Sequence, residues 1–188
     1  AGSIGSEIVR QLIAYFPAKI ILVDQAESGL FDLEYELSGL IPSNTELVVK
    51  VADVSDYQRM ALIFKTHKPG IVFHAAAYKH VPLMEKNPYE AVKINIVGTQ
   101  VLAELAAENG VDKFVMVSTD KAVNPTNVMG ATKRFAEMYT QSMNQLEGVR
   151  TKFIATRFGN VLGSNGSVIP LFKKQIERGG PVTVTHPE

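Results

Sequence analysis

Residues 1–24 of the 188-residue chain read AGSIGSEIVRQLIAYFPAKIILVD, and this stretch decides the fold. A glycine turn opens a run that carries apolar residues at helical spacing. A short segment rich in β-branched residues follows at 20–23, as expected of a strand buried on both faces. The stretch therefore predicts a helix packed on the strand that follows it, which is the unit from which parallel sheets are built.

The same alternation continues along the chain. Short apolar runs predict parallel strands at 20–23, 46–51, 71–74, 113–117 and 152–156. Helical spacing predicts helices between them at 6–15, 29–40, 57–68, 87–109 and 130–147. Asp53 and Ser55 are expected to cap the third helix, and Gly110 is expected to end the fourth. The expected fold class is α/β, a doubly wound parallel sheet of the Rossmann type.

Both ends of the chain are expected to be truncations. A turn such as Gly2 to Gly5 normally follows a buried strand, and the last eight residues begin an extended segment that stops. We therefore expect residues 1–188 to form one dinucleotide-binding domain that lacks its first, central strand and most of a C-terminal substrate segment.

Composition narrows the function classes. With 46% hydrophobic and 20% charged residues, the chain has the profile of a globular domain. Its 19 basic and 19 acidic residues cancel, which argues against nucleic acid as a partner. The absence of cysteine excludes disulfides and thiolate metal sites, and no metal site is expected. No run approaches the roughly 20 apolar residues of a membrane span, and a cytoplasmic location is expected.

The glycine turn is the first candidate cofactor site. Gly2, Ser3, Ile4 and Gly5 open a helix, whose N-terminus favours a pyrophosphate, although a plain helix entry fits equally well. Asp24 ends the next strand, where a carboxylate accepts hydrogen bonds from a ribose and repels a 2′-phosphate. This favours NAD over NADP, with a turn-capping role for the carboxylate as the alternative.

Ligands of doubly wound sheets bind at the carboxyl ends of the strands, so the residues after the other strands are candidates too. Asp53 and Val54 are expected near the adenine, unless Asp53 only caps a helix. Ala75, Ala76 and Ala77 follow the next strand. Three small side chains in a row allow the backbone to pass close to a flat ligand, and tight helix packing is the alternative. Lys79 and His80 come next and could reach phosphate or sugar.

The strongest signal is the run Ser118, Thr119, Asp120 and Lys121, which places hydroxyls, an acid and a base at one strand end. Lys133 follows on a helix and shares a face with Met129, four residues earlier. Four reactive side chains in succession indicate a catalytic site, with a solvated loop and a surface lysine as the alternative.

These motifs carry a resemblance. The segments HAAAYKHVP at 74–82, STDKAVNPTN at 118–127, MGATK at 129–133 and GNVLGS at 159–164 resemble the nucleotide-sugar 4,6-dehydratases of bacterial polysaccharide biosynthesis. This CapD-like group belongs to the extended short-chain dehydrogenase/reductase superfamily. Met129 stands where the superfamily has tyrosine, as in the long, membrane-anchored members of the group.

The resemblance implies NAD as cofactor and a UDP-N-acetylhexosamine, with UDP-N-acetylglucosamine expected, as substrate. In this reaction a hydride passes from carbon 4 to NAD, water leaves across carbons 5 and 6, and the hydride returns to carbon 6. The product is a 4-keto-6-deoxy sugar nucleotide for surface glycans. The resemblance implies that Asp120 protonates the leaving hydroxyl, that Lys121 removes the carbon 5 proton, and that Lys133 orients the nicotinamide ribose. It also implies that Asn95 supports Lys133, that Asn160 contacts the diphosphate, and that Ser167 contacts the uridine.

These roles require a protonated Asp120 and a neutral Lys121 at neutral pH. Met129 has no ionisable proton. Thr119 is therefore expected to contact the carbon 4 oxygen, with Asp120 or water relaying the proton.

Two other functions stay open: a nucleotide-sugar epimerase, which normally uses the tyrosine, and a non-catalytic NAD-binding module. The resemblance also implies a homo-oligomer, and a membrane anchor in full-length relatives would place the domain at the cytoplasmic face of the inner membrane.

Overall fold

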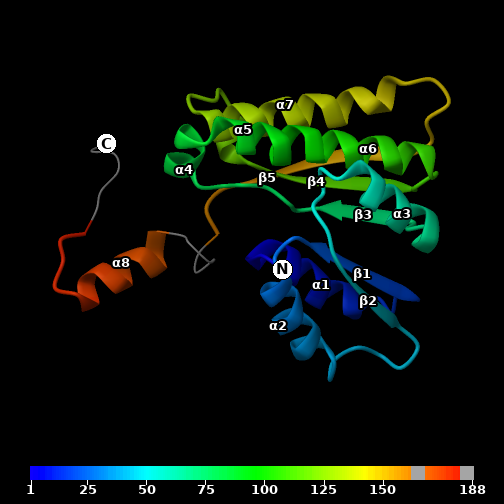
Figure 1. Ribbon diagram of the computed structural model, residues 1–188, viewed down its shortest axis with the longest axis horizontal. Helices are drawn as coiled ribbons and strands as arrows, with labels where there is room; N and C mark the ends of the chain where they lie inside the picture. The colour runs from blue at the N-terminus through cyan, green and yellow to red at the C-terminus, as the bar shows by residue number, and fades with distance from the viewer. Residues whose placement is uncertain (162–167, 183–188) are drawn as a thin grey trace.

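The computed structural model describes residues 1–161 and 168–182, in which helices and strands alternate (Figure 1). All five predicted strands are confirmed, and each matches its predicted range to within two residues. In chain order the elements are α1 (Ser3–Ile13), β1 (Lys19–Asp24), α2 (Glu27–Leu37), β2 (Glu46–Val51), α3 (Tyr57–His67), β3 (Ile71–His74), α4 (Val81–Lys86), α5 (Pro88–Ala91), η1 (Val92–Val97), α6 (Gly98–Glu108), β4 (Lys113–Thr119), η2 (Asp120–Ala122), α7 (Val128–Ser142), η3 (Met143–Gln145), β5 (Lys152–Phe158) and α8 (Val168–Glu177).

The strands are parallel but form two sheets, β1–β2 and β3–β4–β5. In the part of the chain that the structure describes, β1 and β3 each pair on one edge only. A cavity of about 1150 Å³ separates them and is lined by every residue of both strands. The described strands thus form two separate sheets, and the cavity lies between β1 and β3.

Each sheet has its own hydrophobic core. Helices α6 and α7 cover one face of β3–β4–β5, whereas α1 and α2 lie with β1–β2 (Figure 1). The larger core contains Phe114 and Met116 of β4, and Phe114 packs on Phe153 with ring centroids 5.5 Å apart. The smaller core joins Leu22 of β1 to Leu30 and Leu37 of α2. Ile21 and Val23 of β1 also pack against the larger core, so the two units are in contact as well as lining one cavity.

The predicted helix at 87–109 is confirmed as one helical run, α5–η1–α6, whose middle is a π-helix. Short π segments occur frequently at functional sites. Helix α4 was missed because six residues are too few for a periodic signal. The C-terminal end at Gly110 is confirmed, since this residue follows α6 with a φ of 66°.

The capping prediction for α3 was wrong. The Asp56 side chain accepts the cap hydrogen bond from Arg59 N, whereas Asp53 accepts from the backbone and hydroxyl of Ser55. The two carboxylates lie three residues apart, and only the later one stands directly before the first helical residue. Among the described residues no helix is both long and apolar enough to cross a membrane.

Candidate active site

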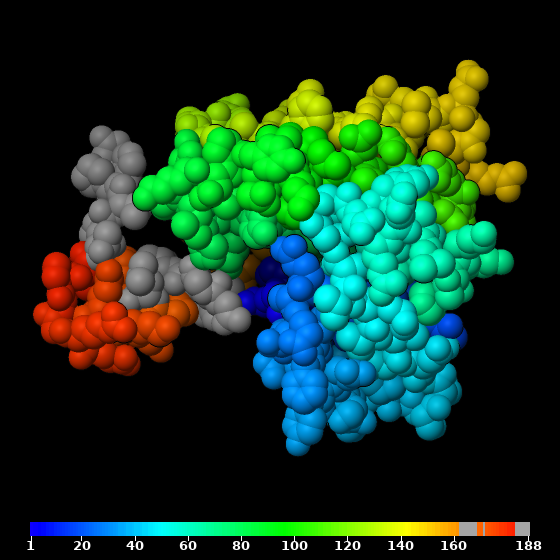
Figure 2. Space-filling view, in the orientation of Figure 1, coloured from blue at the N-terminus to red at the C-terminus, as the bar shows by residue number. Residues whose placement is uncertain are grey.

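The cavity between the sheets continues to the carboxyl ends of β3, β4 and β5, and Figure 2 shows a hollow between the blue N-terminal and green central segments. Most predicted site residues meet there. Its lining includes Gly2, Ser3, Ile4, Gly5, Asp24, Val54, Ala75, Ala76, Ala77, Lys79, His80, Thr119, Lys121, Met129, Lys133 and Asn160. Asp53 lines a smaller pocket beside it, together with Gly2, Asp24 and the three alanines.

The glycine turn leaves space at the start of α1. Gly2 is the N-cap of α1 without a side-chain cap hydrogen bond, and a Cβ added there would meet nothing within 4 Å. A Cβ on Gly5 would lie 4.0 Å from Ala75 Cβ, the far wall of the cavity. Protein packing does not require glycine at Gly2, so the turn fits a cradle for an anionic group at the helix N-terminus.

The two strand-end carboxylates differ in their partners. Asp24 accepts a hydrogen bond from Ala26 N (2.9 Å), which is the turn-capping role, and its other oxygen contacts the Ala1 ammonium group at 2.5 Å. Burial opposes ionisation of Asp53, but hydrogen bonds from Ser55 and an ion pair with Lys93 (3.1 Å) lower its pKa. Both groups are therefore anionic neighbours of the cavity.

The run after β4 forms a compact polar cluster. Thr119 Oγ1 donates to Asp120 Oδ1 at 2.8 Å, and Lys121 reaches the same oxygen through its backbone N (2.9 Å) and Nζ (3.2 Å). The Thr119 hydrogen bond lowers the pKa of Asp120, burial opposes this effect, and Lys121 lowers the pKa further. The expectation of a protonated Asp120 is therefore wrong for this arrangement, because three donors converge on one carboxylate oxygen.

Lys121 links two strand ends. Besides Asp120, its Nζ donates to Asn160 Oδ1 at 3.1 Å. Asn160 was expected to contact a diphosphate, and its carbonyl oxygen instead contacts the ammonium group. Asn160 also lines the cavity, so it can position Lys121 there.

Lys133 projects from α7 into the cavity wall. It is only 5% exposed, and its Nζ donates to Val117 O at 2.8 Å. Burial lowers the pKa of Lys133 to about 8, and the Glu137 carboxylate one turn later partly opposes this effect. Met129 is 2% exposed and packs against Met84 and Ala91, so it offers an apolar surface at this point.

The start of α7 is fixed by several contacts. Asn127 Oδ1 accepts from Gly130 N at 2.8 Å, and Glu85 of α4 accepts from Val128 N at 2.6 Å. A Cβ on Gly130 would lie 2.3 Å from Lys121 O. Glycine is thus required where α7 passes against η2, and this contact sets the distance between Lys121 and Lys133.

Asn95 does not line the cavity, contrary to its expected place at the cofactor. It is fully buried in η1, where Oδ1 accepts from Tyr78 N and Nδ2 donates to Tyr78 O and Thr132 Oγ1. Asn95 thereby fixes the backbone of Tyr78, a cavity residue of the motif at 74–82 to which sequence reasoning gave no role. His74 of the same motif was also given no role. Glu137 and its partner Arg157 were missed, because no sequence motif marks them.

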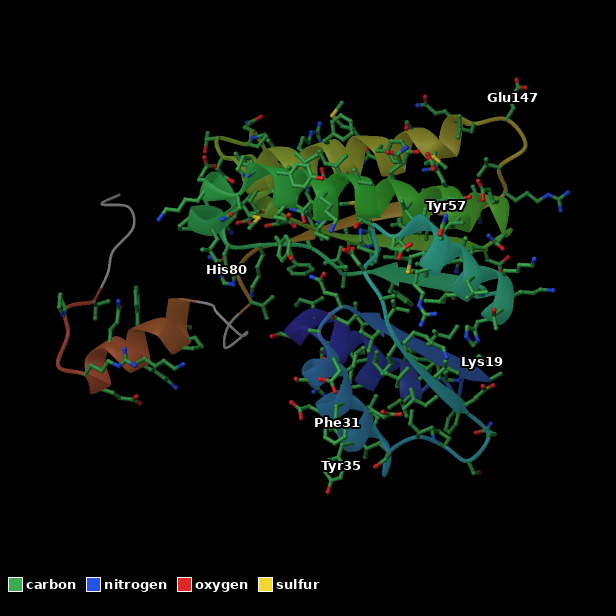
Figure 3. All side chains as sticks on the ribbon, in the orientation of Figure 1. Lys19, Phe31, Tyr35, Tyr57, His80 and Glu147 are labelled. Atoms are coloured by element: carbon green, nitrogen blue, oxygen red, sulfur yellow. The ribbon has the colours of Figure 1, made fainter. Side chains whose placement is uncertain are left out.

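Lys79 and His80 line the cavity as predicted, and Figure 3 shows His80 beside α4. His80 is the N-cap residue of that helix. Ser167, expected on the uridine side, lies outside the described residues.

Comparison with known proteins identifies relatives. The family model described as "Polysaccharide biosynthesis protein" matches residues 1–188. The capsular polysaccharide biosynthesis protein CapD of Staphylococcus aureus is 58% identical over all of this chain and 31% of its own length. A UDP-N-acetylglucosamine 4,6-dehydratase (inverting) of Campylobacter jejuni is 40% identical over 98% of this chain and 54% of its own. The chain thus spans about a third to half the length of these relatives.

Among solved structures, Pen from Bacillus thuringiensis is similar with a TM-score of 0.89 and 38% identity, over 98% of this chain and 57% of that one. The resemblance to CapD-like proteins and the Rossmann-type fold are both confirmed. The chain belongs to the polysaccharide biosynthesis protein family, within the CapD-like group of the short-chain dehydrogenase/reductase superfamily.

Proposed function

We propose that this domain catalyses the NAD-dependent 4,6-dehydration of a UDP-N-acetylhexosamine, with UDP-N-acetylglucosamine as the substrate. The observation that carries the proposal is the hydrogen-bonded cluster of Thr119, Asp120 and Lys121, in which Thr119 and Lys121 line one cavity with Lys133 and the non-ionisable Met129. The names of the S. aureus and C. jejuni relatives support both the pathway class and the reaction.

The cavity fits NAD. The open N-terminus of α1 at Gly2 suits a pyrophosphate, Asp24 suits the adenosine ribose, and Lys133 suits the nicotinamide ribose. When bound, NAD accepts a hydride from carbon 4 of the sugar and returns it to carbon 6. The residues of this chain supply the proton transfers.

Asp120 begins the cycle as a carboxylate. As carbon 4 is oxidised, its hydroxyl proton passes to Thr119 Oγ1 while the Thr119 proton passes to Asp120, along the 2.8 Å hydrogen bond that joins them. A carbon 4 ketone forms and Asp120 becomes a neutral acid. The low pKa of Asp120 thus suits the first step and sets up the second.

Elimination uses that stored proton. Lys121, which pairs with Asp120 in the resting site, first loses its own proton to solvent. The neutral amine then removes the carbon 5 proton, which the new ketone acidifies, and Asp120 protonates the hydroxyl that leaves carbon 6 as water. When the hydride returns to carbon 6, the Lys121 ammonium group gives its proton to carbon 5. Asp120 is again a carboxylate, and the neutral Lys121 regains its proton from solvent, so each turnover restores both groups.

Single-turnover experiments separate the two stages. With UDP-N-acetylglucosamine, Thr119→Val should slow formation of reduced cofactor by about 100-fold or more, because the path to Asp120 is broken. Lys121→Met should form reduced cofactor without releasing water, as read by absorbance and by the mass of the sugar nucleotide. Unchanged turnover in Thr119→Val would refute the relay.

Two rivals give different results in the same assay. An epimerase would return a sugar nucleotide of unchanged mass, and Met129 argues against it because it cannot take the carbon 4 proton. A non-catalytic module would bind NAD without turnover, and Asp120→Asn would alter nothing but structure.

A further inference from the structure

Glu137 is a buried carboxylate that the proposed reaction does not use. Its side chain is 1% exposed, on the inner face of α7. Arg157 of β5 grips both oxygens, with Nε donating to Oε1 at 2.7 Å and Nη2 donating to Oε2 at 2.5 Å. Arg134 adds a weaker contact at 3.3 Å. Burial opposes ionisation, but these guanidinium groups hold the pKa of Glu137 below its usual range.

The carboxylate lies one helical turn after Lys133. Residues at i and i+4 share a helix face, so Glu137 is the charge on α7 that accompanies the buried ammonium group. Among the described residues, His74 of β3 interacts electrostatically with Lys133, Lys121 of η2 lines the same cavity, and Arg157 of β5 is bound to Glu137. Burial, helped by the positive charge of Lys133, lowers the pKa of His74 to about 3, so this ring is neutral.

We propose that Glu137, whose charge Arg157 partly balances, is a positioning residue that keeps the buried Lys133 ammonium group charged at the cofactor ribose. The role of Lys133 toward the cofactor rests on the proposed function. The charge coupling itself rests on the geometry of α7 and β5, because a carboxylate sealed from water acts on a nearby ammonium group with little screening.

The experiment titrates Lys133 directly. Lysine labelled with carbon-13 at the ε-position is incorporated into the protein, and the Lys133 signal is assigned by its loss in Lys133→Met. Glu137→Gln should lower the measured pKa of Lys133 by about one unit or more. Arg157→Gln should raise it, because the carboxylate charge is then less neutralised. Opposite signs cannot arise if the pair only holds α7 to β5, since both variants would break the same contact.

Glu104→Gln is the matched control. This carboxylate of α6 accepts a hydrogen bond from Tyr139, and its loss should leave the pKa of Lys133 unchanged.

A second measurement follows NAD affinity by calorimetry between pH 7 and 9. The affinity should fall as the pH rises, and in Glu137→Gln this fall should begin at a lower pH than in the unaltered protein. An unmoved Lys133 titration in a folded Glu137→Gln protein overturns the inference. If Glu137→Gln does not fold, the upward shift in Arg157→Gln decides, and its absence overturns the inference as well. The NMR result holds whether or not any sugar is turned over, so it is independent of the proposed reaction.

Discussion

His74 ends β3 as a buried, neutral ring. It is 2% exposed, its Nε2 is 2.8 Å from Thr99 Oγ1, and its Nδ1 has no partner among the described residues. Burial lowers the pKa of His74 to about 3, so the folded state binds fewer protons than the unfolded state between that value and about 6.5. The stabilising effect of the neutral ring is thus complete above pH 6.5 and is lost as the pH falls toward 3.

We expect the free energy of unfolding of His74→Gln to fall less steeply below pH 6.5 than that of the unaltered chain. In the unaltered chain, protonating this site should reduce the free energy of unfolding by about 3 kcal/mol between pH 7 and pH 4. Urea denaturation at a series of pH values measures the slope. His80→Gln, which alters an exposed histidine, should keep the original slope, and equal slopes in His74→Gln and the unaltered chain would contradict the expectation.

At this scale, sequence predicted the identities of the reactive groups but not their charge states. Thr119, Asp120 and Lys121 are adjacent in the chain, so their proximity needed no fold. The charge of Asp120 depends on which donors turn toward one oxygen, and the place of Asn95 depends on a π-helical turn. The Glu137–Arg157 pair joins a helix to a strand, and nothing in the local pattern of either segment indicates the other.

Helix α7 is the element that joins Lys133 to the strand-end cluster. Its first turn passes so close to η2 that only Gly130 fits beside Lys121 O. A side chain there must push the helix outward, since the obstacle is backbone rather than a flexible side chain.

We expect Gly130→Ala to lower the free energy of unfolding by about 1–3 kcal/mol and to reduce turnover more than NAD binding. The helix would move Lys133 relative to Lys121 while the glycine turn at α1 stays in place. Chemical denaturation and steady-state kinetics measure the two effects. Gly39→Ala is the control, because a Cβ there meets nothing within 4 Å. A Gly130→Ala protein that behaves like this control would refute the close-contact argument.

Most elements could be predicted from the sequence because their signals are local. Strands such as β2 and β3 match their predicted limits, since each β-branched run begins directly after a polar or glycine residue and stops before a small one. Helix α4 and the turn η2 were not predicted, because segments shorter than two helical turns give no periodic pattern. The cap of α3 was misplaced because Asp53, Ser55 and Asp56 are all good caps, and only the backbone path selects one.

At the scale of the whole molecule, β1 and β3 each leave one edge unpaired in the part of the chain that the structure describes, and association between copies is expected at these edges. Unpaired sheet edges recruit strands from other chains, above all when they are apolar. Ile71 and Phe73 of β3 are 49% and 39% exposed at this edge. The 188-residue chain should therefore associate as its concentration rises.

Ile71→Lys should suppress this association, because a charge on an edge strand opposes strand pairing. Light scattering across a concentration series measures it. Ile176→Lys, an equal change at a 64% exposed position on α8, should leave association unaltered. Equal suppression by both variants would point to net charge rather than to the sheet edge.

The divided core also bears on folding cooperativity. Leu22, Leu30 and Leu37 form a cluster of their own, and only Ile21 and Val23 of β1 pack against the Phe114 core. Amide protons of β1 and β2 can then exchange through local opening of one unit while the other stays folded. A dinucleotide that contacts Gly2 and Asp24 in one unit and Lys133 in the other would bind only when both units are folded. Its binding free energy would therefore couple the two units into one unfolding transition.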